Sequence, residues 1–215
     1  SLAFADAADA LGASLDASAG LDSMSVDLSA LKENLAPSLA LYRDLLREPR
    51  FEQGEIDRVK ASWIAGIQQE KVNPGAVAMR VLPPLLYGKG HPYAIPFTGS
   101  GDEAAINGLT REDLVDFHHD WLRPQNGTLI VVGDTTLAEI VPLLDKQLGD
   151  WKAAGDAPQV KAATDVALPK GPRVFLIDQP GAVQANLFAG QVVAPSSATS
   201  STRFDIANGV IGGDF

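Results

Sequence analysis

The sequence contains no cysteine among its 215 residues. This absence excludes disulfide bonds, thiolate metal sites and thiol nucleophiles. It fits the cytoplasm and the periplasm alike, and of these two compartments we prefer the periplasm. The sequence also lacks the run of about 18 apolar residues that a membrane-spanning helix requires, and its N-terminus has no basic region followed by an apolar block. We therefore expect no membrane span.

Basic residues are scarce as well, with 17 Lys and Arg against 27 Asp and Glu, so the formal net charge is −10. An acidic surface repels phosphate groups, and no cluster of Lys or Arg provides a local exception. Nucleic acid is therefore excluded as a partner. Hydrophobic residues make up 46% of the chain, which at this length permits a real core.

Two kinds of periodicity open the chain. The Ala-rich stretch from Leu2 to Leu11 is typical of a helix, and Gly12 can end that helix in a left-handed conformation. Alternation of apolar and polar residues over Leu15 to Ala19 and again over Met24 to Leu28 predicts an antiparallel hairpin.

Three helices are predicted next. Asn34 is expected to cap a helix that ends before Pro49, and a longer helix is predicted from about Glu52 to Lys71. After Pro74 a third helix follows, which the adjacent prolines at 83 and 84 should kink or end. The longer helix should bury one apolar face throughout, which contains Ile56, Val59, Trp63, Ile64 and Ile67.

The second half of the chain mixes helices and strands. Gly88 to Gly101 is expected to be a loop, and Thr110 should cap a helix that precedes an apolar strand from Leu129 to Val132. Leu137 to Leu148 predicts another helix. Further on we expect strands at Val174 to Asp178 and Leu187 to Val193, and a helix at Arg203 to Ile211. The class is therefore α+β, with a mixed or antiparallel sheet packed with helices.

Five short segments carry a family resemblance in their order and spacing. They are Leu11-Gly12-Ala13-Ser14-Leu15, Leu46-Arg47-Glu48-Pro49-Arg50-Phe51, His91-Pro92-Tyr93, Leu109 to Gly133-Asp134, and Gly149-Asp150-Trp151. None is specific alone, but together they span essentially the whole chain. The chain resembles the insulinase/pitrilysin family of zinc metallopeptidases, the inverzincins. This resemblance implies a metallopeptidase-half fold like that of the processing peptidases.

The resemblance also implies that the chain is an inactive half. Active members bind zinc through a His-x-x-Glu-His helix, which would precede Ser1, and through a Glu further along the chain. Aligning the helix from Glu52 to Lys71 sets the acidic positions of active members opposite Val59, Ala65 and Gly66, none of which can bind a cation. We therefore assign no catalytic residue, metal ligand or cofactor to this chain, and we expect zinc in a catalytic half. Glu70 could serve as a ligand only if this alignment is out of register.

The family architecture implies a partner and a substrate class. A related zinc-bearing half, in the same polypeptide or as a separate subunit, would close with this half around a chamber for peptides. In active members a strand beside the metal binds peptide by strand addition, and a plain paired or edge strand is the alternative here. The corresponding residues are Ser14, Leu15, Asp16, Ala17 and Ser18.

These implications lead to a function and a domain plan. We expect the non-catalytic half of a zinc endopeptidase, as in bacterial two-domain peptidases. The alternatives are a scaffold or core subunit without a peptidase partner, or an active zinc domain aligned in the wrong register. Residues 1–152 would form most of an inactive insulinase-type domain, 153–171 a linker, and 172–215 the truncated beginning of a following related domain. We expect the chain to be an excised part of a longer one.

The three histidines are poor metal ligands by position. His118 and His119 are adjacent on a predicted helix, where neighbouring side chains point about 100° apart and cannot both reach one ion. We expect one packed and one solvated imidazole at these positions, and His91, in the loop before Pro92, should stabilise a turn.

Overall fold

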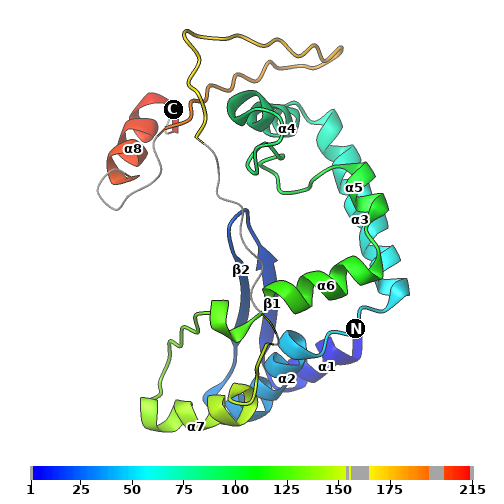
Figure 1. Cartoon of the computed structure of the whole chain (residues 1–215), viewed down its shortest axis with the longest axis vertical. Helices are drawn as coiled ribbons and strands as arrows, with labels where there is room; N and C mark the ends of the chain where they lie inside the picture. The colour runs from blue at the N-terminus through cyan, green and yellow to red at the C-terminus, as the bar shows by residue number, and fades with distance from the viewer. Residues whose placement is uncertain (1, 154, 156–164, 194–200, 214–215) are drawn as a thin grey trace.

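The computed structural model describes residues 2–153, 155, 165–193 and 201–213. Its helices follow an open curve in Figure 1, with α3 and α5 along one side, α4 at one end, and α1, α2, α7 and the β-hairpin at the other. The helices are α1 (Leu2–Ala10), α2 (Leu35–Arg47), α3 (Gln53–Val72), α4 (Pro74–Tyr87), α5 (Glu103–Gly108), α6 (Arg111–Trp121), α7 (Leu137–Leu148) and α8 (Ser201–Asn208). Two short 3-10 helices are η1 (Lys32–Asn34) and η2 (Pro124–Asn126), and η3 (Gly209–Gly213) is a short π-helix.

The sheet in the described residues has two antiparallel strands, β1 (Ser14–Ala19) and β2 (Met24–Ser29). The predicted hairpin and the α+β class are therefore confirmed. The register places Leu15 opposite Leu28 and Ala17 opposite Val26, so these side chains share one face of the hairpin. The Tyr42 hydroxyl of α2 donates a 3.0 Å hydrogen bond to the Val26 carbonyl and ties the hairpin to the helix.

Gly12 ends the first helix as predicted, with a φ of +61° in the left-handed region. The prediction that Asn34 caps α2 through its side chain was wrong. Asn34 directly precedes α2 but its side chain makes no cap hydrogen bond, and its Nδ2 donates to the Leu11 carbonyl at 2.8 Å. The side chain thus connects the ends of two helices rather than capping one.

Helix α3 has the predicted extent, but its apolar face is only partly buried. Ile56 and Ile67 are buried, whereas Val59 and Trp63 are 47% and 48% exposed. The expectation of a uniformly buried face was wrong because no described element covers the middle of this helix on that side. This opening belongs to the candidate site described below.

Pro83 and Pro84 do not end the third helix, because α4 continues through both to Tyr87. A proline at position 83 removes the N–H group that would bond the Met79 carbonyl one turn earlier. That carbonyl accepts a 3.0 Å hydrogen bond from the Phe97 N–H instead. Pro83 is also fully buried, so packing and a replacement donor offset the missing bond.

Capping boxes begin α6 and α7, at Thr110 with Asp113 and at Thr136 with Glu139. In contrast, the strand predicted at Leu129 to Val132 is not formed. A strand requires a ladder partner, and the described residues provide none at this place. The segment is exposed, with Ile130 at 80% and Val132 at 92%.

The strands predicted at Val174 to Asp178 and Leu187 to Val193 are likewise absent from the described residues, for the same reason. The helix predicted at Arg203 to Ile211 is formed as α8 and continues into η3. Most of the predicted linker at 153–171 lies outside the described residues, so the domain boundaries stay a prediction. Within the described parts of the chain, no helix is long and apolar enough to cross a membrane.

Candidate functional site on helix α3 and strand β1

The three positions aligned with the acidic residues of active zinc peptidases lie in the middle of α3. Val59 and Gly66 are about two helical turns apart and therefore share one side of the helix, while Ala65 points to another. All three are exposed. A Cβ atom built on Gly66 would meet nothing within 4 Å, so a larger side chain fits there. The donor set at these positions does not fit zinc, because none of the side chains carries an oxygen, nitrogen or sulfur ligand.

Glu70, one turn further along α3, already has a structural role. Its Oε2 accepts hydrogen bonds from Arg80 Nη1 at 2.6 Å, Ser100 Oγ at 2.7 Å and Thr98 Oγ1 at 3.3 Å. Arg80 also donates to the Gly101 carbonyl at 2.7 Å. This cluster fastens α4 and the loop after it to α3.

The electrostatics of Glu70 agree with that role. Partial burial alone would raise the pKa of its carboxyl, but the hydrogen bonds from Ser100, Arg80 and Thr98 outweigh burial and hold the pKa below its usual value. The carboxylate is therefore charged and held by the Arg80 guanidinium, which favours the alignment that assigns Glu70 no ligand role.

Each histidine has a local partner. His118 Nε2 lies 2.7 Å from the Leu46 carbonyl oxygen, and its ring meets Phe51 edge-on, whereas His119 is exposed beside Asp120. This pair agrees with the expected packed and solvated imidazoles. His91 Nδ1 accepts the Tyr93 N–H at 3.1 Å, which is the predicted turn-stabilising contact. In the parts of the chain that the structure describes, no group of three or more His, Cys, Asp or Glu could hold a metal ion.

Strand β1 has one free edge within the described residues, because it pairs only with β2. Four of the five predicted peptide-binding residues are exposed and Leu15 is half-buried. On the outer face Asp16 lies directly opposite Asp27, and Ser18 Oγ lies 2.9 Å from Ser25 Oγ. The backbone groups along the free edge can bond an extended chain.

An apolar groove of about 850 Å³ lies between α1, α2, α3 and the α5–α6 segment. Of the predicted site residues only Val59 lines it, so the structure does not bring β1 and this stretch of α3 into one cavity. Sequence reasoning missed the groove because it treated Val59 and Trp63 as covered core. The signal that could have found it is the apolar spacing of Phe4 and Ala7 on α1, which nothing else in the sequence explained.

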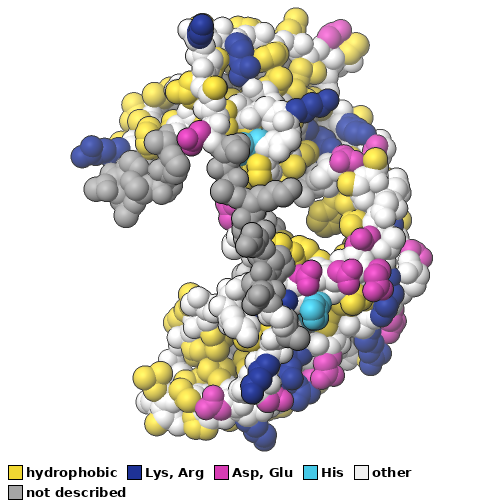
Figure 2. Space-filling view, in the orientation of Figure 1, with side chains coloured by type: hydrophobic (Ala, Val, Ile, Leu, Met, Phe, Trp, Pro, Cys, Tyr) yellow, Lys and Arg dark blue, Asp and Glu magenta, His cyan; other side chains and the backbone are white. Residues whose placement is uncertain are grey.

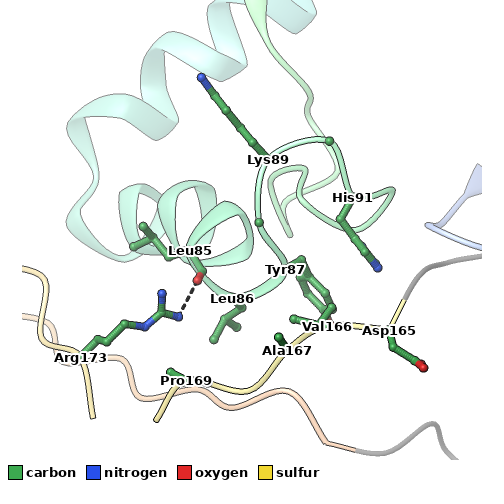
Figure 3. Close-up of a pocket in the computed structure, with 12 residues that line it drawn as sticks. Leu85, Leu86, Tyr87, Lys89, His91, Asp165, Val166, Ala167, Pro169 and Arg173 are labelled. Atoms are coloured by element: carbon green, nitrogen blue, oxygen red, sulfur yellow. Dashed lines mark hydrogen bonds between the residues drawn. The ribbon is translucent and has the colours of Figure 1, made fainter. Parts of the chain in front are cut away.

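A second cavity of about 480 Å³ lies between the end of α4, the loop after it and the segment from Asp165 to Arg173 (Figure 3). Arg173 Nη2 donates to the Leu85 carbonyl at 2.7 Å across this cavity. Beside it, the Tyr87 and His91 rings stack with centroids 5.0 Å apart.

The chain matches the family described as the peptidase M16 inactive domain over residues 108–215. It is 34% identical over 77 residues to the probable zinc protease PqqL of Haemophilus influenzae, a match that covers 32% of this chain and 8% of that protein. The crystal structure of a peptidase M16 inactive domain from Pseudomonas fluorescens superimposes with a TM-score of 0.69 at 28% identity, covering 78% of this chain and 40% of that one.

Two similar structures extend the likeness in fold. The periplasmic protease PqqL of Escherichia coli has a TM-score of 0.61 at 20% identity, covering 76% of this chain and 18% of that one. Pitrilysin has a TM-score of 0.61 at 15% identity, covering 75% of this chain and 17% of that one. The chain thus spans less than half the length of each of these relatives. The resemblance seen in the sequence is confirmed, and the chain belongs to the peptidase M16 inactive-domain family.

Proposed function

We propose that this chain is the non-catalytic half of a zinc metallopeptidase and forms part of a peptide-binding chamber next to a zinc-bearing half. The observation that carries the proposal is the middle of α3. By the alignment made from the sequence, Val59, Ala65 and Gly66 correspond to the acidic positions of active members, and the nearby carboxylate of Glu70 is held by Arg80. Zinc catalysis needs three protein donors and a water, so this half supplies no catalytic site.

In this role the chain binds and orients the peptide and does not itself cleave a bond. An extended peptide adds to the free edge of β1, where the backbone N–H and C=O groups of the alternate residues Leu15 and Ala17 bond it, and the alternating side chains contact it. The exposure of Ser14, Asp16 and Ser18 supports this role. By enclosing the peptide, this half orients it and excludes water, while zinc bound in the other half supplies the Lewis-acid chemistry.

The experiment combines this chain with the zinc-bearing half encoded in the same or the neighbouring gene. Peptide hydrolysis is measured with each half alone and with both. The proposal predicts activity only in the combination, and a loss of at least tenfold for Ala17→Pro, because proline removes an edge N–H donor. The matched control is Ala5→Ser, an exposed substitution on α1 that should leave hydrolysis unchanged.

Two results would overturn the proposal. Hydrolysis by the zinc-bearing half alone at the full rate would remove the need for this chain. If the two halves associate tightly but hydrolyse no peptide, alone or combined, the result would favour a scaffold subunit instead.

A further inference from the structure

The outer face of the β-hairpin is entirely polar and combines two carboxylates with four hydroxyl groups. Its residues, all exposed, are Ser14, Asp16 and Ser18 on β1 and Ser25, Asp27 and Ser29 on β2. From Ser14 to Ser29 the sequence contains three Asp and no Lys or Arg. The hairpin therefore presents an acidic face without a cation of its own.

The three carboxylates of the hairpin differ in what holds them. Asp22, at the tip, accepts a 2.6 Å hydrogen bond from the Tyr93 hydroxyl, and Asp27 Oδ2 accepts one of 2.9 Å from Ser25 Oγ. The Asp16 side chain forms neither a hydrogen bond nor an ion pair with any described residue. Because Asp16 also faces Asp27 across the sheet, a cation bound beside it would relieve an unfavourable like-charge pair.

The backbone of β1 decides which residue of an added peptide meets Asp16. Gly20 N donates to the Ser23 carbonyl at 2.8 Å at the end of the hairpin, and bonded pairs alternate from there along the register. The N–H and C=O groups of Asp16 therefore point to β2, and those of Leu15 and Ala17 point to the free edge. A peptide added antiparallel bonds these two residues.

The peptide residue between those two bonded positions lies directly opposite Asp16. The two form a non-hydrogen-bonded pair, which is the type of antiparallel pair with the closest side chains. Residues opposite each other in a sheet share a face, so this peptide side chain lies on the acidic face. Its neighbours in the peptide lie on the opposite face, beside Leu15 and Ala17.

The same geometry disfavours two other occupants of the edge. A second copy of β1 that pairs its Ala17 with Leu15 would set Asp16 against its own counterpart, a like-charge pair. The unpaired segments at 129–132 and 174–177 consist only of apolar residues, so either one would leave the Asp16 carboxylate beside an apolar side chain. A basic side chain matches the position better than any of these.

We propose that the β1 edge selects extended peptides that carry Lys or Arg opposite Asp16, with small or apolar residues on either side. The location rests on the proposed function, which puts the peptide on this edge, and the charge preference extends it to a class of cationic peptides. The long side chain pairs with Asp16 and extends over the sheet toward Asp27. Asp16 is thus a specificity-determining residue that does not touch the bond to be cleaved.

The test measures binding of three fluorescein-labelled peptides of about 9 residues to the combined halves. The peptides share one Thr- and Ala-rich sequence and differ only in a central Lys, Gln or Glu. EDTA removes zinc so that the peptides stay intact, and fluorescence anisotropy gives each Kd. We expect the Lys peptide to bind about two- to fivefold more tightly than the Gln peptide, and the Glu peptide to bind most weakly. The differences should vanish in about 1 M salt.

Matched variants assign the preference to Asp16. Asp16→Asn should make the Lys and Gln peptides bind equally, and Asp16→Lys should make the Glu peptide the tightest. Asp57→Lys, an equal change of charge at an exposed position on α3, should preserve the order of the wild-type chain. Ala17→Pro removes an edge N–H donor and defines the binding that does not involve this edge.

Four results would overturn the proposal. Equal binding of the three peptides, lost in Ala17→Pro, would remove the charge preference and leave the proposed function standing. A Lys preference that persists in Asp16→Asn would originate outside the hairpin. Self-association that Ala17→Pro abolishes would assign the edge to a second copy of the chain. If Ala17→Pro weakens binding of none of the peptides, the proposed peptide role of β1 fails together with the preference.

Discussion

The packed body around α2 and α3 differs sharply from the extended segments at 129–132 and 174–193. In the body, Leu39, Tyr42 and Ile67 are buried by neighbouring helices, whereas Val132, Val174 and Leu187 are more than 90% exposed. Both regions are rich in apolar residues, so composition does not distinguish them. The helices therefore pack against other described residues, whereas the segments predicted to be strands have no partner among the described residues. Figure 2 shows apolar side chains spread over the surface near both ends of the molecule.

The strongest test of this comparison is truncation of one apolar side chain in each region. Ile67→Ala should lower the free energy of unfolding by about 2–5 kcal/mol, because it leaves a cavity at a fully buried site. Val132→Ala should change it by less than about 0.5 kcal/mol. Urea denaturation of both variants measures the contrast, and equal losses would break the comparison.

The Glu70–Arg80 pair should give the next largest effect. Replacing Arg80 by Met leaves a part-buried carboxylate without its cation and should cost about 2 kcal/mol, less than a fully buried pair because solvent reaches both side chains. Arg58→Met, which breaks an exposed pair with Glu55, should cost less than about 0.5 kcal/mol. A similar loss for both variants would remove the special role of Glu70.

The same pair predicts a pH dependence. Because the folded pKa of Glu70 lies below its ordinary value of 4.5, its contribution is fully present above that pH and is lost as the pH falls through the folded pKa. The wild-type chain should therefore lose stability below about pH 4.5 more steeply than Glu70→Gln. Parallel unfolding curves from pH 6 to pH 3 would contradict this.

A smaller effect is expected at the helix that follows the exposed segment at 129–132. Thr136→Ala removes the capping box of α7 and should cost about 1 kcal/mol, while the neighbouring Thr135→Ala should cost less than half of that. Thermal unfolding followed by circular dichroism measures both. If Thr136→Ala leaves the free energy of unfolding unchanged, α7 is stabilised by packing alone.

The smallest effect should come from β1. Asp16 and Asp27 face each other across the hairpin, and like charges in that position are unfavourable. Asp16→Asn should stabilise the chain by about 0.2–1 kcal/mol at low salt, with Asp6→Asn on α1 as the control. A loss of stability would indicate that Asp16 has a favourable partner.

Local signals predicted the helical part of the fold well. The capping threonine at 110 and the apolar spacing on α3 act within a few residues, so the sequence alone reveals them. The failures involve partners distant in the chain. Pro83 stays helical because Phe97 replaces its donor, and the strand at Leu129 to Val132 depends on a ladder that no local pattern specifies.

The candidate site divides in the same way. The assignment of Val59, Ala65 and Gly66 to acidic positions of active members stays a prediction from alignment with the family, whereas the hairpin follows from period-two alternation. The extent of the groove beside Val59 and the bonds that hold Glu70 were not predictable, since they depend on how α1, α2 and the loop at Thr98 to Gly101 pack around α3.

Zinc content tests the central claim most directly. The metal is measured by mass spectrometry on the full-length parent protein and on its Gly66→Glu version, after dialysis against trace zinc. The account predicts no zinc attributable to this half in either protein, because one added carboxylate does not replace three donors. One tightly held zinc in the parent that disappears on Glu70→Gln would contradict it.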